Sequence, residues 1–575
     1  MDNQRLMVWG AFALLVWFTY QAWMQDYGPA PVQPTVISEP ADPADPALPG
    51  AAADSISLPE LGDTPAQEPA GSLPGDTETG DTETAAPDTR QTIRVTTDVL
   101  ALNISRRGGT LVQASMLGYP VAKDRPDELV QLLSPERNAL GLIRTGLRSL
   151  TGVAADHEVL FSAPRTEFSL DGDDQIVVPL TWVGDNGLVV EKRLTFTRGS
   201  YAIGVEQTVT NNSSEPWRGD QYTQLLRRSR GRERSMFDVD SYSFDGPITY
   251  NGEKAEKYER DDLMEDGPVD YSTDDGWVAA IQHHFLSAIV PEADAQHVFR
   301  VEVSGDTMIA SVVGAKQTIE PGASHTFRRT LFVGPKAQVQ LGELHERLKL
   351  TVDYGWLTIL SQPMFWLLAL IYQYVGNWGL SIIIITILIK LAFYKLTEAS
   401  GRSMAKMRNL QPRMKALQER YKDDRQTLSQ QTMELYKREK VNPAAGCLPI
   451  LIQMPFFLAF YWVLVESVEM RQAPFAFWIT DLSVRDPLFI LPLIMGAAML
   501  LQQKLNPAPA DPVQARVMQI MPIMFTGFFA FFPAGLVLYW VTNTVLSIAQ
   551  QWKINKVVEK EAVAHKGGKK KKSKE

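Results

Sequence analysis

Six apolar runs of helical length, five of them after residue 377, constrain this 575-residue chain more than any other feature. A helix of about 20 apolar residues spans the hydrocarbon core of a bilayer and satisfies all of its own backbone hydrogen bonds there. The sequence therefore predicts a multi-pass membrane protein with a helical core. The runs cover residues 6–23, 378–397, 447–465, 488–505, 513–532 and 534–552.

The first run follows a short head that carries Arg5. A signal peptide is the competing interpretation, but no small-residue cleavage site follows, so residues 1–27 are predicted to be an uncleaved anchor with a cytoplasmic N-terminus. Residues 28–90 are rich in Pro, Ala, Asp, Glu, Gly and Thr. Such a segment has too little apolar surface to offset the entropy of ordering it, so we expect a disordered acidic linker.

Residues 91–337 change to short alternating runs separated by turn residues, a pattern typical of a large antiparallel β-sandwich. His283 and His284 fall in one such run, so their side chains should point to opposite faces and make a poor metal pair. We find no phosphate loop or catalytic triad signature, and Cys447 is the single cysteine. We expect no enzymatic activity, catalytic residue, metal or cofactor, although a groove for sugars or peptides stays open.

Charge decides how the later runs cross the membrane. Residues 353–390 contain no charge between Asp353 and Lys390, so they fit either two crossings or one crossing preceded by an interfacial helix. The insert 398–441 is dense in Lys and Arg and should be cytoplasmic. With the sandwich in the periplasm, one crossing at 377–397 is required, and 338–376 should hold a periplasmic interfacial helix.

Counting crossings in the same way places the remaining segments. An even number of crossings after the cytoplasmic insert returns the basic tail to the cytoplasm. The prediction is a set of four further transmembrane helices at 442–466, 487–505, 513–532 and 534–553, a periplasmic loop at 467–486, a cytoplasmic loop at 506–512 and a cytoplasmic tail at 554–575.

The basic insert has its own pattern. Apolar residues recur at spacings of three and four, which is typical of a coiled-coil seam, so 398–441 should form a cytoplasmic helical hairpin. Its charges fit a solvated face attracted to lipid headgroups, or contact with ribosomal RNA or a ribosome-bound chain, and charge alone does not choose. The first helix contributes Met407, Leu410, Met414, Leu417 and Tyr421, and the second contributes Leu428 and Leu435.

Lys390 interrupts the apolar run SIIIITILIKLAFY. A lysine within the bilayer costs a few kcal/mol on insertion scales, so it either reaches for the headgroups or serves a wet site. Thr386, Tyr394 and Thr397 follow helical spacing with Lys390 and should share one face of a single helix. Gln453 and residues 542–544 are further polar companions. No acidic residue lies at matching depth, which suggests that the partner of Lys390 comes from outside the protein.

Several long motifs resemble the YidC, Oxa and Alb family of membrane protein insertases, in its Gram-negative form. They are SIIIIT, GRSMAKMRNLQP, KVNPAAGCLPILIQMPFFLAFYWVL, RQAPFAFWITDLSVRDP and FPAGLVLYWVTN. The resemblance implies a five-helix core with a groove open to cytoplasm and lipid, and a periplasmic β-sandwich, in the cell inner membrane. It implies nascent membrane proteins as substrates and the Sec translocon with its accessory subunits as partners; no DNA is expected.

Carried over position by position, the resemblance implies two groups of substrate-contacting residues, although plain helix packing is an equal alternative for the apolar ones. Lys390 stands where the family usually has arginine, and a lysine lacks the bidentate fork of a guanidinium. Trp540 stands where a second tyrosine is common. The groove group is Lys390, Thr386, Gln453 and Trp540, and the group along which a substrate slides is Met454, Phe457 and Phe528.

Two rival functions remain. A small-solute or anion transporter could use Lys390 as a binding site, but transporters tend to carry internal repeats, which this sequence lacks. A membrane-anchored periplasmic binding protein would leave the polar stripe and the basic hairpin unexplained.

Overall fold

The structure is a computed structural model, and it describes most of the chain after residue 90. The predicted anchor at 1–27 and the predicted linker at 28–90 lie outside the described residues, as do Cys447 and most of the predicted loop at 506–512. The described residues are 91–150, 153–228, 243–293, 295–421, 424–439, 441, 448–505 and 512–572.

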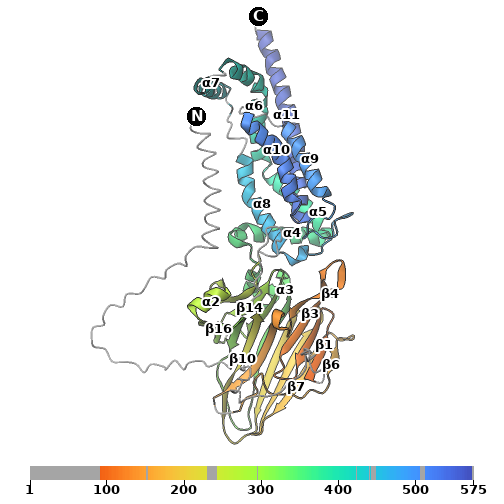
Figure 1. The fold of residues 1–575 in the computed structure, drawn as a ribbon, viewed down its shortest axis with the longest axis vertical. Helices are drawn as coiled ribbons and strands as arrows, with labels where there is room; N and C mark the ends of the chain where they lie inside the picture. Colours follow the sequence, from red (N-terminus) through yellow and green to blue (C-terminus); the bar gives the residue numbers. More distant parts are fainter. Residues whose placement is uncertain are drawn as a thin grey trace, which may run out of the picture. The chain divides into compact units, whose positions relative to one another are not determined.

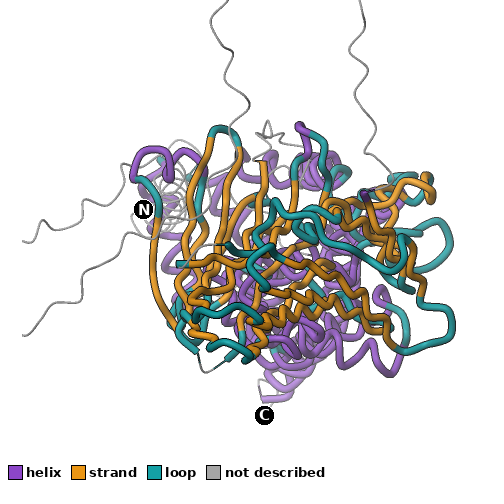
Figure 2. Tube along the Cα trace, turned by 90° about the horizontal axis from the view of Figure 1, so that it is seen from below, coloured by secondary structure: helices purple, strands orange, loops and turns teal. Residues whose placement is uncertain are grey.

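The strands of the β-domain, orange in Figure 2, form two sheets, and the first has 11 strands. All its pairings are antiparallel except the one between its last two strands. Its order is β13 (Val269–Thr273), β16 (His297–Ser304), β17 (Thr307–Val313), β10 (Trp217–Arg228), β5 (Gly141–Ser149), β3 (Leu111–Ala122), β2 (Leu100–Ser105), β1 (Thr92–Thr96) and β6 (Glu167–Ser169), with β18 (Gln317–Ile319) on β10 and β4 (Arg125–Leu133) on β3.

The second sheet has eight antiparallel strands and packs against the first through a shared apolar core (Figure 1). Strand β9 shows how a strand contributes to this core. Its residues alternate between half-buried and buried, so one face of the pleat packs in the core. The predicted β-sandwich is confirmed. The order is β12 (Ala255–Lys257), β11 (Gly246–Tyr250), β14 (Trp277–Gln282), β15 (Phe285–Pro291), β19 (Ser324–Pro335), β9 (Ala202–Asn211), β8 (Leu188–Thr197) and β7 (Gln175–Val183).

The helices follow, apart from one short helix within the β-domain. Helix α11 packs against α5, α8 and α9, while α10 packs on α9 and α4 packs on α5 and α8. The helices are α2 (Arg260–Asp266), α3 (Gln338–Leu344), α4 (Thr358–Val375), α5 (Trp378–Ala392), α6 (Tyr394–Arg420), α7 (Arg425–Arg438), α8 (Leu448–Glu466), α9 (Ile490–Leu505), α10 (Pro512–Phe529) and α11 (Ala534–Lys572).

By length and composition, one described helix is long and apolar enough to cross a membrane, namely Gly355–Val375. A second is added if the bent pair Trp378–Ala392 and Tyr394–Arg420 is one span. Ile452–Glu466 and Ile490–Leu505 are shorter apolar helices. The helix that passes the test alone includes α4, which the sequence places along the membrane surface and which lies crosswise to α8 in Figure 1.

The single helix predicted at 377–397 is wrong in one respect. It ends at Ala392, and α6 leaves from Tyr394 at an angle of 69°. Neither glycine nor proline stands at this break, so the sequence pattern gave no signal for it. Phe393, at the break, instead packs edge-on against Phe456 of α8, with ring centroids 5.1 Å apart. Thr386 and Lys390 therefore lie on one helix, and Tyr394 and Thr397 on another.

Residues 467–489 connect α8 to α9 and are called the cap loop below. The loop holds together the starting ends of two helices. The side-chain amide of Asn377 donates to the carbonyl of Phe475 at 2.9 Å, just before α5 begins. At the start of α11, the backbone N–H of Gly535 donates to the carbonyl of Leu482 at 2.9 Å. The cap loop therefore closes one end of the helix bundle.

The described residues of the basic insert from residue 403 onward (403–421, 424–439 and 441) belong to a different compact unit from the sandwich and the other helices. Asp424 caps α7, because its carboxylate accepts hydrogen bonds from the backbone N–H groups of Gln426 and Thr427 at 3.1 and 3.0 Å. Arg413 of α6 reaches Glu439, just after α7, at 2.7 Å. Of the predicted seam, Leu410, Met414 and Leu435 are buried.

Helix α11 is longer than the crossing predicted at 534–553, since it continues to Lys572. No glycine or proline interrupts residues 553–566, and Glu, Lys and Ala in this stretch favour a helix.

Candidate functional site

A hollow of about 250 Å³ opens beside Lys390, between the end of α5, the start of α6 and α11. Lys390 is half-buried, and its Nζ donates to the Oγ of Ser547 at 2.8 Å. The described residues that line the hollow include two lysines and no carboxylate, so its electrostatic potential is positive. They are Ile387, Lys390, Leu391, Tyr394, Leu546, Ala549, Gln550 and Lys553.

The structure brings together only part of the predicted polar stripe. Tyr394 lines the hollow with Lys390. The hydroxyl of Thr397 accepts a hydrogen bond of 2.7 Å from the amide of Gln550, which is itself at the hollow. Thr386 is 2 % exposed, and its hydroxyl donates to the carbonyl of Ile382 in its own helix. Lys553 also lines the hollow, although nothing in the sequence spacing relates it to Lys390.

The predicted sliding residues fall in and around an aromatic cluster formed by α8, α10 and α11. Trp540 packs edge-on against Phe457 at 4.8 Å and close to Phe529 at 5.1 Å, so it belongs with these rings and does not line the hollow at Lys390. Phe528 is 55 % exposed at the edge of the cluster. Met454 is exposed on α8, and its neighbour Gln453 is half-buried.

His283 and His284 are not on a strand with opposed side chains, and that prediction is wrong. They form the turn between β14 and β15, where the backbone reverses, so both rings point the same way and stack with centroids 3.7 Å apart. Both Nε2 atoms contact the carbonyl oxygen of Val465 in α8, at 3.1 and 2.9 Å. Because a carbonyl only accepts, each ring must carry its proton on Nε2.

Further contacts join the β-domain to the cap loop. The ammonium of Lys123, at the tip of the β3–β4 hairpin, donates to the carbonyl of Thr480 at 2.5 Å. In return, the guanidinium of Arg471 donates to the carbonyl of Pro120 at 2.9 Å. The cap loop is therefore bonded to the sandwich as well as to the helices.

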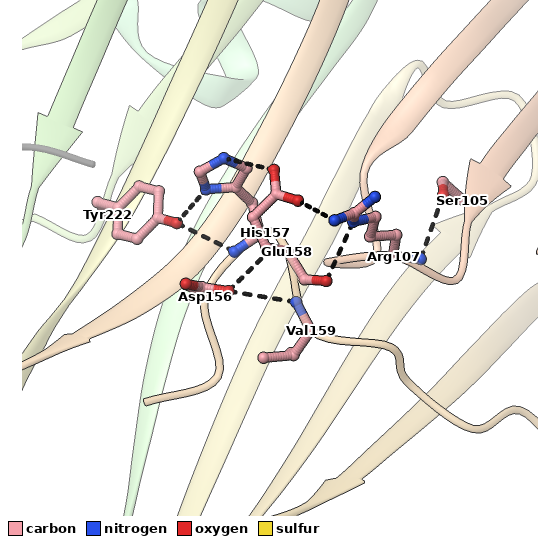
Figure 3. Close-up of polar contacts among 7 residues, drawn as sticks. All are labelled: Ser105, Arg107, Asp156, His157, Glu158, Val159 and Tyr222. Atoms are coloured by element: carbon pink, nitrogen blue, oxygen red, sulfur yellow. Dashed lines mark hydrogen bonds and ion pairs between the residues drawn. The ribbon is translucent and has the colours of Figure 1, made fainter. Parts of the chain in front are cut away.

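A polar cluster in the sandwich was not predicted (Figure 3). The Nδ1 of buried His157 lies 2.6 Å from the hydroxyl of Tyr222, and Glu158 bridges the ring of His157 to Arg107. Burial, and next the charge of Arg144, lower the pKa of His157, which favours the neutral ring. These bonds tie the segment around residue 157 to β10, and we assign the cluster a structural role.

The described part of the chain contains no group of three or more His, Cys, Asp or Glu side chains that could hold a metal ion.

Comparison with known proteins defines the class first. Residues 370–561 match the family described as 60Kd inner membrane protein, and residues 92–367 match the family described as YidC periplasmic domain. The chain is therefore an inner-membrane protein whose β-sandwich is periplasmic.

Relatives over the whole length make the assignment specific. The chain is 46 % identical over 572 residues to the membrane protein insertase YidC of Thioalkalivibrio sulfidiphilus, covering 97 % of this chain and 99 % of the relative. It is 45 % identical over 567 residues to the YidC of Nitrosococcus oceani, covering 98 % and 100 %. The chain belongs to the YidC family of membrane protein insertases, which confirms the resemblance found in its motifs.

A crystal structure described as an active YidC insertase with the first transmembrane domain resolved is also similar, at 19 % identity and a TM-score of 0.36. The match covers 80 % of the present chain and 92 % of the chain in the crystal structure. The low score adds nothing to the assignment.

Proposed function

We propose that this chain inserts newly made proteins into the inner membrane and helps them fold, alone or together with the Sec translocon and its accessory subunits. The observation that supports this most is the hollow at Lys390, where two lysines lie beside apolar and hydroxyl groups. A positive, partly polar hollow on apolar helices suits a chain segment that is acidic first and apolar afterwards.

Insertion has to move the polar end of a substrate through hydrocarbon, where bare charges and peptide groups cost several kcal/mol. A hydrated groove shortens that path. In this mechanism Lys390 attracts acidic residues of the incoming tail, with Lys553 adding to the field. The tail passes outward, and the apolar segment then moves sideways into lipid along Met454, Phe457 and Phe528. Burial of the apolar segment drives the step, and no covalent chemistry is required.

The proposed topology places both termini in the cytoplasm, with the anchor, α5, α8, α9, α10 and the first part of α11 crossing the membrane. Helix α4 lies along the periplasmic surface, which its crosswise direction in Figure 1 supports. Thr386, Gln453 and Trp540, on α5, α8 and α11, stay in the proposal as the groove residues that the resemblance implies.

The basic hairpin at 398–441 receives the incoming chain and contacts the ribosome, and the basic tail adds affinity for ribosomes and anionic lipids. We therefore expect a shortened hairpin to abolish insertion in a purified, ribosome-free assay, whereas removal of residues 566–575 leaves it intact. The tail deletion should instead weaken ribosome binding in a salt-dependent way. Equal defects of both variants without ribosomes would contradict this division of roles.

The periplasmic sandwich is proposed to dock onto the Sec translocon rather than to act on the substrate. Deletion of residues 28–325, which keeps the anchor and α4, should then leave unassisted insertion largely intact. Complete loss of insertion by a folded, membrane-embedded deletion product would show that the sandwich acts on the substrate.

The central test reconstitutes the purified chain into liposomes and supplies a single-span substrate with an acidic tail. Protease protection of the tail should depend on the protein, and protein-free liposomes are the control. In the same vesicles, anion efflux should stay at the protein-free level. Efflux without tail protection would favour the anion transporter instead.

A further inference from the structure

Backbone strain in the described residues gathers in one place. Three residues other than glycine have a positive φ, and all belong to the cap loop: Gln472 at 58°, Phe477 at 54° and Phe489 at 56°. This region is crowded for a bulky side chain, and glycine would occupy it without strain. A loop that needed only the turn would not use phenylalanine twice, so the two rings themselves require an explanation.

Both phenylalanines are exposed, to different degrees. Phe477 is 93 % exposed, and Phe489 is 40 % exposed. Val484 and Leu488, in the same loop, are exposed as well. We call these four residues the loop patch.

The residue that follows Phe477 in the chain is held in position. This residue is Trp478, and the ring of Phe477 stacks on it with centroids 6.1 Å apart and planes 26° apart. The indole N–H of Trp478 donates to Asp486 at 3.0 Å, and the second oxygen of that buried carboxylate accepts from the backbone N–H of Leu491 at 2.7 Å. Trp478, next to Phe477 in the chain, is therefore tied to the first turn of α9.

The contacts between the cap loop and the sandwich determine on which side of the membrane the loop patch lies. The cap loop is bonded to the periplasmic domain through Lys123 and Arg471, so the loop patch lies at the periplasmic end of the helices. Exposed apolar residues continue from the patch along α9, with Leu493 62 % and Ile494 43 % exposed. In an inner-membrane protein, such a surface on an apolar helix faces lipid. Exposed Arg485 adds a positive charge beside the patch that suits phosphate headgroups.

We propose that Phe477, with Leu488 and Phe489, inserts into the outer leaflet of the inner membrane, at the boundary between headgroups and acyl chains. In segments that lie on a membrane, Phe and Leu side chains are buried at this boundary. The strained backbone then serves to point a ring into lipid from a rigid loop. Because the same loop closes the helix bundle and holds the sandwich, the anchor fixes the depth of both relative to the bilayer.

The test uses the fact that the chain has one cysteine. In a Cys447→Ser background, Phe477→Cys is spin-labelled in the full-length protein and reconstituted into liposomes of phosphatidylethanolamine and phosphatidylglycerol. Collisions of the label with oxygen, which concentrates in lipid, are compared with collisions with a water-soluble nickel chelate. We expect the label at 477 to favour oxygen over nickel.

Two positions of matched exposure calibrate the result. Leu493→Cys on α9 is the lipid reference, and Met264→Cys on α2 of the sandwich, 61 % exposed, is the water reference. A nickel accessibility at 477 equal to that at 264 would overturn the proposal. So would a label shielded from both reagents, which would mean that a protein covers the patch. Phe489→Cys is the second variant, should the first not fold, and the same outcomes decide.

Discussion

The ammonium of Lys390 donates a hydrogen bond of 2.8 Å to the hydroxyl of Ser547. That hydroxyl in turn donates to the carbonyl of Asn543 at 2.7 Å, within α11. The lysine is thus connected to α11 through a neutral group, which orients the charge without neutralising it. A carboxylate in the place of Ser547 would have cancelled the field that we propose for the hollow.

The first prediction concerns this charge. Lys390→Arg should retain insertion, because the positive charge survives. Lys390→Ala and Lys390→Glu should impair insertion of acidic-tailed substrates more than of neutral-tailed ones, with the glutamate variant worse. Protease protection of paired substrates measures the difference.

Ser547→Ala is the matched control for Lys390, since it removes the hydrogen bond and keeps the charge. A hydrogen bond to a charged group contributes about 1.5–3 kcal/mol, so Ser547→Ala should lower stability, but it should affect acidic-tailed and neutral-tailed substrates equally because the charge remains. If Lys390 merely reached for the headgroups, an apolar residue would relieve a cost. Full activity of Lys390→Ala on both substrates would therefore contradict the proposal that the charge of Lys390 attracts acidic tails.

The sequence predicted the elements that depend on local pattern. The alternation of apolar and polar residues predicted the sandwich, and the length of the apolar runs predicted the helices. Both patterns follow from the period of the side chains. It failed where a contact distant in sequence decides. The break at Phe393 has no glycine or proline, and Phe456 packs on it from 63 positions along the chain. Likewise, Lys553 lines the hollow of Lys390 only because α11 packs on α5.

The second prediction concerns the shared acceptor at the junction of sandwich and helices. Phenylalanine in place of His283 or His284 keeps a planar ring but donates nothing to the carbonyl of Val465. Either histidine alone can still satisfy that oxygen, so each single variant should lower the unfolding free energy by less than about 1 kcal/mol. The double variant leaves the carbonyl unsatisfied and should cost about 2–3 kcal/mol, more than the sum. Unfolding midpoints in detergent measure this, and strictly additive effects would refute the shared acceptor.

The third prediction is a pH dependence. Lys192 is completely buried in the sandwich, where its ammonium donates to the carbonyl and hydroxyl of Thr145, both at 2.8 Å. Burial lowers the pKa of Lys192 from 10.5 to about 7. Between these values the unfolded chain binds a proton that the folded chain does not, so the unfolding free energy should rise with pH from about 7 upward.

Lys192→Met removes this titration, so the rise should flatten, although the variant is less stable overall because Thr145 loses a donor. Hydrogen exchange of β5 and β8 between pH 6.5 and 9.5 reports the slope. An unchanged slope in the variant would assign the pH dependence to other groups.

The fourth prediction compares two glycines on neighbouring helices. A Cβ added to Gly496 of α9 would lie 2.1 Å from the hydroxyl oxygen of Thr526 on α10, whereas one added to Gly527 meets nothing within 4 Å. The hydroxyl of Thr526 is held by the carbonyl of Pro522 at 2.7 Å, so it does not yield freely. Gly496→Ala should therefore force the helices apart and cost about 1–3 kcal/mol of unfolding free energy. Gly527→Ala should be neutral or stabilising by up to about 1 kcal/mol.

The cause of the Gly496 effect is separable from helix propensity by a second change. Thr526→Ala removes the clashing oxygen, so Gly496→Ala should cost much less in that background than in the native chain. Unfolding midpoints of the four proteins give the coupling between positions 496 and 526. A coupling near zero would show that α9 and α10 do not meet at this glycine, and the close approach would then have no part in the stability of the bundle.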